Sequence, residues 1–168
     1  DDDVFISING IDIPKFAFST ENREGIRHKL NIDTKTKLVG FVGVLQDRKN
    51  PLFALEVFAN YHKLNPNSVF LMLGKGPLKG QINEKIQSLG IRDSVIQYDF
   101  IADVNRWYSA MDALLFPSMY EGLSLVALES QISNLEILAS DTNVEAIFAT
   151  SNIKKMHGLD VAKWASEL

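Results

Sequence analysis

A chain of 168 residues has the length of one ordinary domain, which buries about 70% of its unfolded surface and folds without disulfides. An apolar fraction of 46% and a charged fraction of 23% are typical of compact soluble proteins and exclude disordered and collagen-like chains. The net charge of -4 argues against a nucleic acid partner, the absence of cysteine excludes thiolate chemistry, and no apolar run reaches the roughly 20 residues that cross a bilayer.

The first residues are mostly polar, and they lack the usual features of a protein N-terminus. The chain opens on three aspartates instead of methionine and lacks the basic-then-apolar pattern of a signal peptide, so we expect a piece cut from a longer protein. Residues 1–36 are expected to be a lead-in segment with a single helix at 22–30.

From residue 37 onward, short apolar runs alternate with longer stretches of helical periodicity. The runs, which are expected to be buried parallel strands, span 38–45, 69–73, 95–98, 113–116, 135–139 and 153–156. Helices are expected at 51–65, 78–89, 104–111, 123–132, 144–149 and 161–168. The alternation predicts one α/β domain over 1–168 with its βα core at 37–168, a Rossmann-like doubly wound parallel sheet of about six strands with helices on both faces.

In such sheets, ligands bind at the loops that follow the carboxyl ends of the strands. The loop after the first run carries Arg48 and Lys49 just before a helix start, where cations and free amides favour a phosphate, although a solvated Arg-Lys pair is an equal alternative. The loop after the second run has glycines at 74, 76 and 80. Their spacing only loosely resembles a dinucleotide fingerprint, so a tight turn is the favoured interpretation.

Two carboxylates lie eight residues apart around the fourth loop and the helix after it, Glu121 and Glu129. The amides of residues 123–126, at the expected helix start, lie between them and face an anion. Carboxylates accept hydrogen bonds from hydroxyl groups, so two of them flanking a phosphate site predict a nucleotide-sugar ligand. The alternative is two surface glutamates, but Glu129 has mainly apolar neighbours on its helix, an awkward place for an idle charge.

Other kinds of site find no support in the sequence. There is no Walker A sequence, no HExxH and no Asp/His cluster for a metal. His28, His62 and His157 have no context that makes one of them a catalytic base, and the aromatic residues are not interleaved with basic ones.

The motifs together resemble the C-terminal, donor-binding half of the group 1 (family four) retaining GT-B glycosyltransferases, and most closely those of bacterial capsular and exopolysaccharide biosynthesis. The resemblance covers nearly the whole chain. Its motifs are Asn9-Gly10-Ile11-Asp12 with Phe16, Gly43 through Lys49-Asn50, Gly74-Lys75-Gly76-Pro77, Ala110-Met111-Asp112, Pro117-Ser118, Glu121 and Glu129 with seven residues between them, and Ser140-Asp141.

The resemblance implies a role for each matching residue. Lys49 would bind the donor pyrophosphate and Glu121 the sugar hydroxyls, which makes these two the catalytic residues, and Glu129 would bind the ribose hydroxyls. The base would lie near residues 99–101. The full set of implied donor-binding residues is Gly43, Arg48, Lys49, Gly74, Gly76, Phe100, Ile101, Glu121, Gly122, Leu123, Ser124, Leu125 and Glu129.

The family reaction implies the partners. A hexosyl unit would pass from a nucleotide-diphosphate sugar, expected to be a UDP-sugar, to a polysaccharide or lipid-linked acceptor, with retention and without metal or other cofactor. The acceptor half would be an N-terminal Rossmann domain of the same protein, so this piece alone is expected to be inactive. We expect a cytoplasmic protein, at the inner membrane face when the acceptor is lipid-linked; this acidic half offers no basic amphipathic helix for membrane insertion.

Three departures from the family pattern leave alternatives open. Val44 stands where an arginine is usual, Asp99 where a glycine is common, and Asn134-Leu135-Glu136 where Gly-x-Pro is usual. The alternatives are half of a GT-B-like nucleotide-sugar epimerase and a diverged, non-catalytic scaffold domain.

Overall fold

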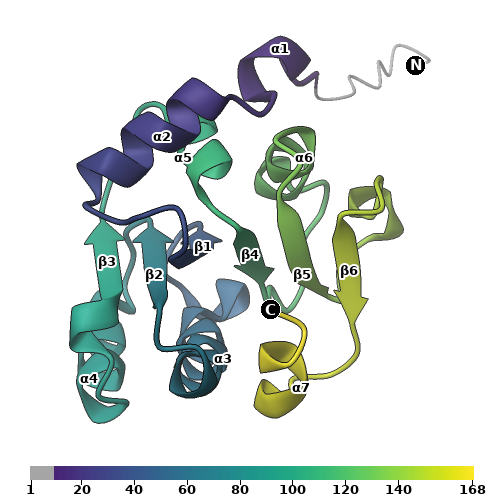
Figure 1. Ribbon diagram of the computed structural model, residues 1–168. Helices are drawn as coiled ribbons and strands as arrows, with labels where there is room; N and C mark the ends of the chain where they lie inside the picture. The colour runs from purple at the N-terminus through teal and green to yellow at the C-terminus, as the bar shows by residue number, and fades with distance from the viewer. Residues whose placement is uncertain (1–9) are drawn as a thin grey trace.

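The structure is a computed structural model that describes residues 10–168, so Asn9 of the first motif lies outside the described residues. One six-stranded parallel sheet forms the middle layer (Figure 1). Its strands are β1 (Lys37–Val42), β2 (Ser68–Leu73), β3 (Val95–Tyr98), β4 (Ala113–Phe116), β5 (Glu136–Ser140) and β6 (Ile153–Met156). The order β3-β2-β1-β4-β5-β6 reverses between β1 and β4 and confirms the predicted Rossmann-like fold.

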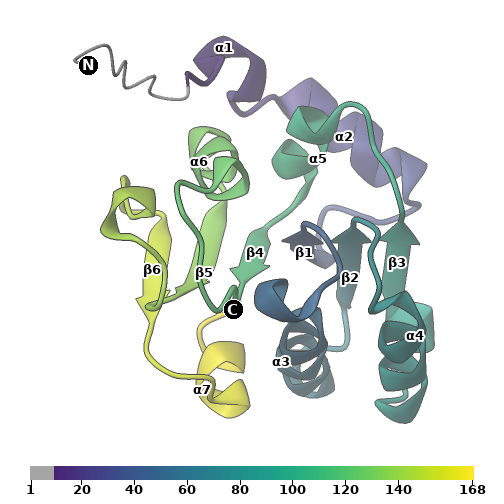
Figure 2. The same cartoon turned by 180° about the vertical axis from the view of Figure 1, so that it is seen from behind.

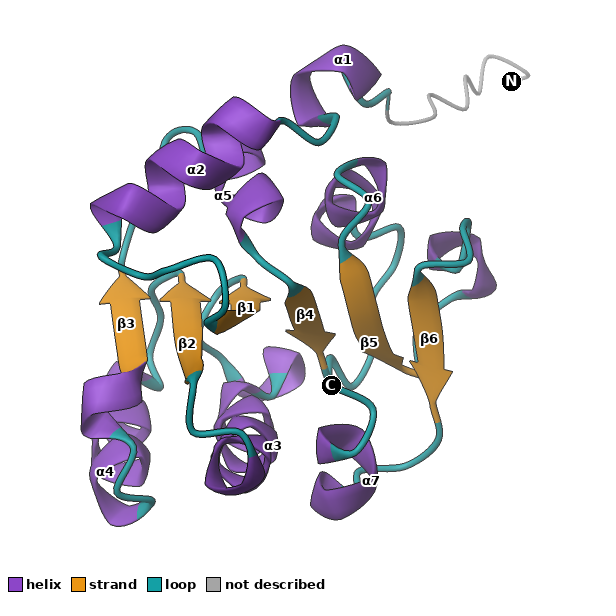
Figure 3. Cartoon of the chain, in the orientation of Figure 1, coloured by secondary structure: helices purple, strands orange, loops and turns teal. Residues whose placement is uncertain are grey.

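Helices cover both faces of the sheet (Figures 1 and 2). One face carries α3 (Pro51–Leu64), α4 (Lys79–Ser88) and α7 (Val161–Ala165), and the other carries α1 (Ile13–Phe16), α2 (Thr20–Lys29), α5 (Val104–Ala110) and α6 (Leu125–Ile132). Between β1 and β6, strands alternate with helices or with the short 3₁₀ turn η3 (Glu145–Ile147), and further turns are η1 (Asp47–Lys49) and η2 (Arg92–Ser94) (Figure 3). Leu38 and Val39 are consecutive and enter opposite cores, because side chains alternate across a strand.

The first strand ends earlier than the sequence predicts. β1 stops at Val42, and residues 43–45, which were expected to continue it, form a loop. Gly43 has a φ of +152°, a conformation that other residues rarely adopt, and turns the chain out of the sheet. The apolar pattern misled because Leu45 is buried in the core although it belongs to the loop.

At the N-terminal side, the structure extends the predicted helix and adds one. The helix expected at 22–30 begins at Thr20, because the Ser19 Oγ caps it by accepting a hydrogen bond from the Asn22 N–H at 3.2 Å. The additional helix α1 has four residues, too few to produce a recognisable helical period.

Three predicted helices are shorter in the structure. The helix expected at 123–132 begins at Leu125, because Ser124 keeps an extended backbone in the N-cap position. The helix expected at 144–149 is only the turn η3, because the backbone beyond it bonds to Gln131 Oε1 instead of continuing a helix. The one expected at 161–168 ends at Ala165. The remaining helices agree with the prediction to within about two residues.

A charged cluster fastens α2 to the amino edge of the sheet. Asp112 forms ion pairs with Arg23 at 2.5 Å and Arg27 at 3.2 Å, and its Oδ2 accepts the Leu38 N–H at 2.7 Å. The buried Arg27 side chain also donates to three backbone carbonyls. Residues 20–36 are therefore part of the packed domain.

The departure at 134–136 does not disturb the connection between α6 and β5. Asn134 has a φ of +55°, in the left-handed region that asparagine tolerates better than most residues other than glycine. Glu136 takes its place in β5 opposite Ala113.

Candidate functional site

A cavity of about 300 Å³ lies at the carboxyl edge of the sheet, beside the switch point between β1 and β4. It is lined by Val42, Gly43, Val44, Leu73, Gly74, Lys75, Asp99, Phe100, Ile101, Val104, Tyr108, Val126 and Glu129. Five of the predicted donor-binding residues meet here although they come from four segments of the chain: Gly43, Gly74, Phe100, Ile101 and Glu129. A mainly apolar cavity with few polar groups suits an organic ligand.

Glu129 is the carboxylate of this cavity. It is half-buried on α6, and the Tyr108 hydroxyl donates a hydrogen bond to its Oε2 at 3.2 Å. Burial raises the pKa of Glu129, and the Tyr108 hydrogen bond offsets part of that rise. Burial and the neighbouring carboxylate raise the pKa of Tyr108 well above its usual value, so the phenol stays a donor. Glu129 is therefore positioned and oriented as a hydrogen-bond acceptor at the cavity wall.

Two cations and a carboxylate form a second group at the same edge. Lys49 Nζ lies 2.6 Å and Arg48 Nη1 3.0 Å from Glu121 Oε1. These contacts are ion pairs by distance, but that oxygen has no well-directed hydrogen bond from residues 10–168. Lys49 and Glu121 are largely buried, at 11% and 9% side-chain exposure, whereas Arg48 is 33% exposed. Lys49 Nζ also lies 5.4 Å from the centre of the Phe116 ring.

This group adjoins the cavity through Gly43. A Cβ at that position would lie 3.7 Å from Lys49 Cδ and Cε, so the lysine side chain passes along the glycine that lines the cavity. The two cations and both predicted glutamates therefore belong to one continuous region, with Glu121 at its charged end and Glu129 at its apolar end.

The loop that carries Glu121 is held from two sides. On one side, the Met119 N–H donates to the Arg48 carbonyl at 2.8 Å, and Arg48 Nη1 donates to the Tyr120 carbonyl at 3.2 Å. On the other, the Thr142 hydroxyl and the Asn143 amide both donate to the Ser118 carbonyl at 3.3 Å. Loops after β1, β4 and β5 thus fix the position of the Glu121 backbone.

The glycines after β2 allow two loops to touch. A Cβ on Gly74 would lie 1.9 Å from the Gly43 carbonyl oxygen, and one on Gly76 would lie 2.4 Å from that of Leu45. Gly74 lines the cavity, but Gly76 does not, so the expectation that both shape its wall is met only by Gly74. Gly80 lies in α4 with open space around it, so it does not take part in this loop contact.

The remaining predicted residues lie between the two groups in sequence but do not line the cavity. Gly122, Leu123 and Leu125 are exposed, and Ser124 is buried at the N-cap of α6. Their contribution would come from the backbone, since the first amides of a helix have no partner within it.

Tyr108 and Lys75 belong to the site, although the sequence predicted no role for either. A buried tyrosine hydroxyl needs a partner, but nothing in the sequence shows that the partner is Glu129, 21 residues further on. Lys75 is exposed and lines the cavity, where it adds a cation near Val44. Asp99, Phe100 and Ile101, near which the base is expected, all line the cavity, and Asp99 also pairs with Lys79 at 2.5 Å.

Residues 10–168 contain no group of three His, Asp or Glu side chains that could hold a metal ion. The same residues include no helix long and apolar enough to span a bilayer.

Comparison with known proteins places this geometry in context. Residues 22–157 match the family model described as glycosyl transferases group 1. A galactosyltransferase of Escherichia coli that acts from UDP-Gal on alpha-D-GlcNAc-diphosphoundecaprenol is 30% identical over 140 residues, which are 80% of this chain and 36% of that protein. The chain therefore spans well under half the length of the curated relatives it matches.

Solved structures agree on the fold. The C-terminal domain of a group 1 glycosyl transferase (LpcC) from Francisella tularensis has a TM-score of 0.81 at 23% identity, covering 94% of this chain and 85% of that one. Anabaena Alr3699/HepE, crystallised with UDP and glucose, has a TM-score of 0.83 at 18% identity, covering 95% of this chain and 44% of that one.

Proposed function

This chain belongs to the group 1 glycosyl transferases, and from that premise we propose that its carboxyl-edge site binds the nucleotide-diphosphate sugar donor, a UDP-sugar, of a retaining glycosyltransferase. One observation carries the proposal: Lys49 and Arg48 converge on Glu121 beside a mainly apolar cavity that ends on Glu129. A nucleotide-sugar has the matching order of parts, with a planar base, whose faces pack on apolar groups, and a ribose at one end, a diphosphate in the middle and a hydroxyl-rich sugar at the other.

Each part of the donor has a chemical counterpart in the site. The base lies against Phe100 and Ile101, and the ribose hydroxyls donate to Glu129, whose other hydrogen bond comes from Tyr108. The diphosphate lies against Lys49, with Arg48 as the second cation in place of the residue that Val44 does not supply. The sugar hydroxyls donate to Glu121, and the amides at the start of α6 face the phosphates.

The proposed reaction uses positive charge to stabilise the leaving group. The bond between the anomeric carbon and the diphosphate breaks, the acceptor oxygen forms its bond on the same face of the sugar, and the acceptor proton passes to the departing diphosphate. Negative charge on that diphosphate grows as the bond breaks, and Lys49 lies where it stabilises this charge without a metal ion.

The acceptor and the complete reaction lie beyond this domain. Since the chain spans about a third of its relatives' length, we propose that an N-terminal domain of the same protein supplies the acceptor site, and that residues 1–168 alone do not transfer a hexosyl unit. The name of the Escherichia coli relative includes a diphosphoundecaprenol acceptor, which supports a lipid-linked acceptor here. We propose that the whole protein meets this acceptor at the cytoplasmic face of the inner membrane.

Calorimetric titration with UDP, GDP and UDP-sugars tests donor binding on the 168-residue chain. We expect UDP to bind and Glu129→Ala to weaken it by about tenfold, because the ribose loses its acceptor. Glu84→Ala, an exposed glutamate on α4, is the matched control and leaves the affinity unchanged. An unchanged affinity in Glu129→Ala contradicts the ribose role, and no binding of any nucleotide favours a non-catalytic domain. Turnover of a UDP-sugar by this chain alone contradicts the expected inactivity.

A further inference from the structure

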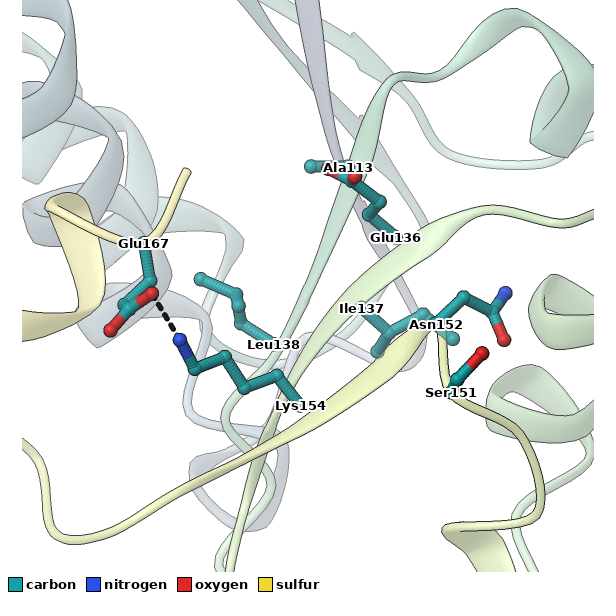
Figure 4. Close-up of a pocket in the computed structure, with 8 residues that line it drawn as sticks. All are labelled: Ala113, Glu136, Ile137, Leu138, Ser151, Asn152, Lys154 and Glu167. Atoms are coloured by element: carbon teal, nitrogen blue, oxygen red, sulfur yellow. Dashed lines mark hydrogen bonds and ion pairs between the residues drawn. The ribbon is translucent and has the colours of Figure 1, made fainter.

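Two cavities open at the amino edge of the sheet, on the side opposite to the proposed donor site, and Glu136 lines both. The first has a volume of about 230 Å³ and is drawn in Figure 4. Three of its polar side chains are already paired, Lys154 with Glu167 (Figure 4) and the Asn152 amide with the Leu135 carbonyl at 2.8 Å. A ligand in this cavity would have to break those contacts.

The second cavity, here named the amino-edge cavity, has open hydrogen-bonding groups. Its volume is about 380 Å³, and its lining comes from α2 and the residue Phe18 before it, the end of α5, the connection from α6 to β5, and the first residues of β1 and β5. That volume lies within the range of about 300–1,000 Å³ found for small-molecule sites. The ring of Phe18, which is 49% exposed, lines it together with Lys37, Asn134 and Glu136.

The polar groups of the amino-edge cavity are only partly satisfied. The Asn134 backbone N–H donates to the Gln131 carbonyl at 2.9 Å, but its side-chain amide makes no hydrogen bond within residues 10–168. Lys37 Nζ lies 3.9 Å from Glu136 Oε2, at the limit of an ion pair, and the Glu136 carboxylate is 73% exposed. The Ser133 hydroxyl is buried without a partner among the same residues.

The chemistry of these groups selects a class of ligand. The charged residues that line the cavity are Arg23, Lys37, Asp112 and Glu136, two positive and two negative, so neither an anion nor a cation is favoured. The Lys37 ammonium and the Asn134 amide nitrogen donate hydrogen bonds, and the Glu136 carboxylate and the Asn134 amide oxygen accept them. This combination suits a ligand with many hydroxyl groups. An exposed aromatic ring beside them suits a ligand that also has an apolar face.

A pyranose ring combines these properties, with hydroxyls at its edge and C–H groups on its faces. We propose that the amino-edge cavity is a second carbohydrate site, which binds a neutral sugar by packing on Phe18 and by hydrogen bonds to Lys37, Asn134 and Glu136. The site opens at the edge of the sheet opposite to the donor site, and Tyr108 lines both cavities. Its ligand is either a free sugar or one unit of a glycan chain.

The test is an NMR titration of the 15N-labelled chain with maltose and with maltohexaose. We expect amide shifts at residues 18, 37, 134 and 136 with a Kd on the order of 1 mM. Phe18→Ala and Asn134→Gly each weaken binding by about fivefold or more, and glycine keeps the left-handed backbone of position 134. Leu64→Ala, at an apolar residue at the end of α3 that is 81% exposed, is the control and binds as the wild type does.

Each outcome decides between the possibilities. Tighter binding of maltohexaose indicates a glycan chain, and equal binding indicates a free sugar. The proposal is wrong if the variants bind like the wild type, if the shifts cluster only around Glu129, if neither sugar shifts these amides, or if inorganic phosphate shifts them equally. UDP added to the same sample reports separately on the donor site, so failure of one proposal is distinguishable from failure of the other.

Discussion

Two clusters in this domain each hold one carboxylate between two cations. They differ in how the cations and backbone amides contact the two carboxylate oxygens. At the amino edge, both oxygens of Asp112 are occupied by Arg23, Arg27 and a backbone amide. At the carboxyl edge, Lys49 and Arg48 both approach one oxygen of Glu121, which has no well-directed hydrogen bond from residues 10–168.

The difference separates a structural ion cluster from one that can exchange partners. Removing a group from the Asp112 cluster leaves a buried guanidinium without its counter-charge, so this cluster contributes to folding. In the Glu121 cluster, both cations share one carboxylate oxygen and Arg48 reaches solvent, so a diphosphate can replace the carboxylate as the partner of the cations. The same residue types therefore have different roles because of their geometry.

The largest effect is expected from Asp112→Ala. It strands Arg27 in the interior and should lower the free energy of unfolding by about 3–5 kcal/mol, measured by urea denaturation. Glu121→Ala is the comparison variant. It leaves the largely buried Lys49 without a counter-charge, but Arg48 reaches solvent, so the cost should be smaller. Equal losses in the two variants would show that the clusters do not differ in this way.

A large effect is also expected from Gly74→Ala at the carboxyl edge. The new Cβ would lie 1.9 Å from the Gly43 oxygen at a φ of +150°, so the two loops must separate. We expect a loss of about 1–3 kcal/mol in unfolding free energy and weaker UDP binding. Gly80→Ala, in a helix with open space around it, should instead gain about 0.5–1 kcal/mol. A Gly74→Ala variant as stable as the wild type would contradict the close contact.

Lys49→Met tests the cations of the carboxyl-edge cluster. UDP affinity should fall by about tenfold, because the diphosphate loses its contact with the largely buried positive charge of Lys49. Arg48→Met should have a smaller effect because Arg48 is more exposed, and Lys63→Met, an exposed lysine on α3, should have none. Calorimetry measures all three, and a full effect from Lys63→Met would mean that only net charge matters.

Glu121→Gln tests whether Glu121 and the diphosphate compete for Lys49 and Arg48. Without its charge, Lys49 and Arg48 are free for the diphosphate, so UDP alone should bind about two- to fivefold more tightly. The additional affinity of a UDP-sugar over UDP should be lost, because the sugar hydroxyls lose their best acceptor. If UDP binding weakens in this variant, Glu121 is not a competitor for the cations.

The smallest effect concerns Glu129 and pH. Burial raises its pKa in the folded state, so the stability linked to its neutral form is present below its ordinary value of 4.5 and is lost as the pH rises through the raised value. Glu129→Gln removes this pH-dependent loss of stability. The Tm of the variant should therefore be slightly higher than that of the wild type at neutral pH but not in acid. Its UDP affinity should fall. Thermal melts at both pH values check this, and a parallel pH dependence in the two proteins would count against it.

Most of the fold could be predicted from the sequence, because buried parallel strands are short apolar runs and their connecting helices have a clear period. All six strands lie where such runs occur. The errors fall where tertiary contacts override the local pattern. Leu45 belongs to a loop, but its side chain is buried in the core, so the apolar pattern extended the strand too far. The residues after Ile147 leave the helix because Gln131 binds their backbone.

The sequence by itself determined which residue types meet at the carboxyl edge, since parallel strands bring their following loops together. Only the tertiary structure decided their partners. It set Lys49 and Arg48 on one oxygen of Glu121, gave Glu129 the hydroxyl of Tyr108, and used Gly76 for loop contact instead of the cavity wall. The physical reason is that distances of a few ångströms between segments far apart in the chain depend on the packing of the whole domain, which no local pattern of residues encodes.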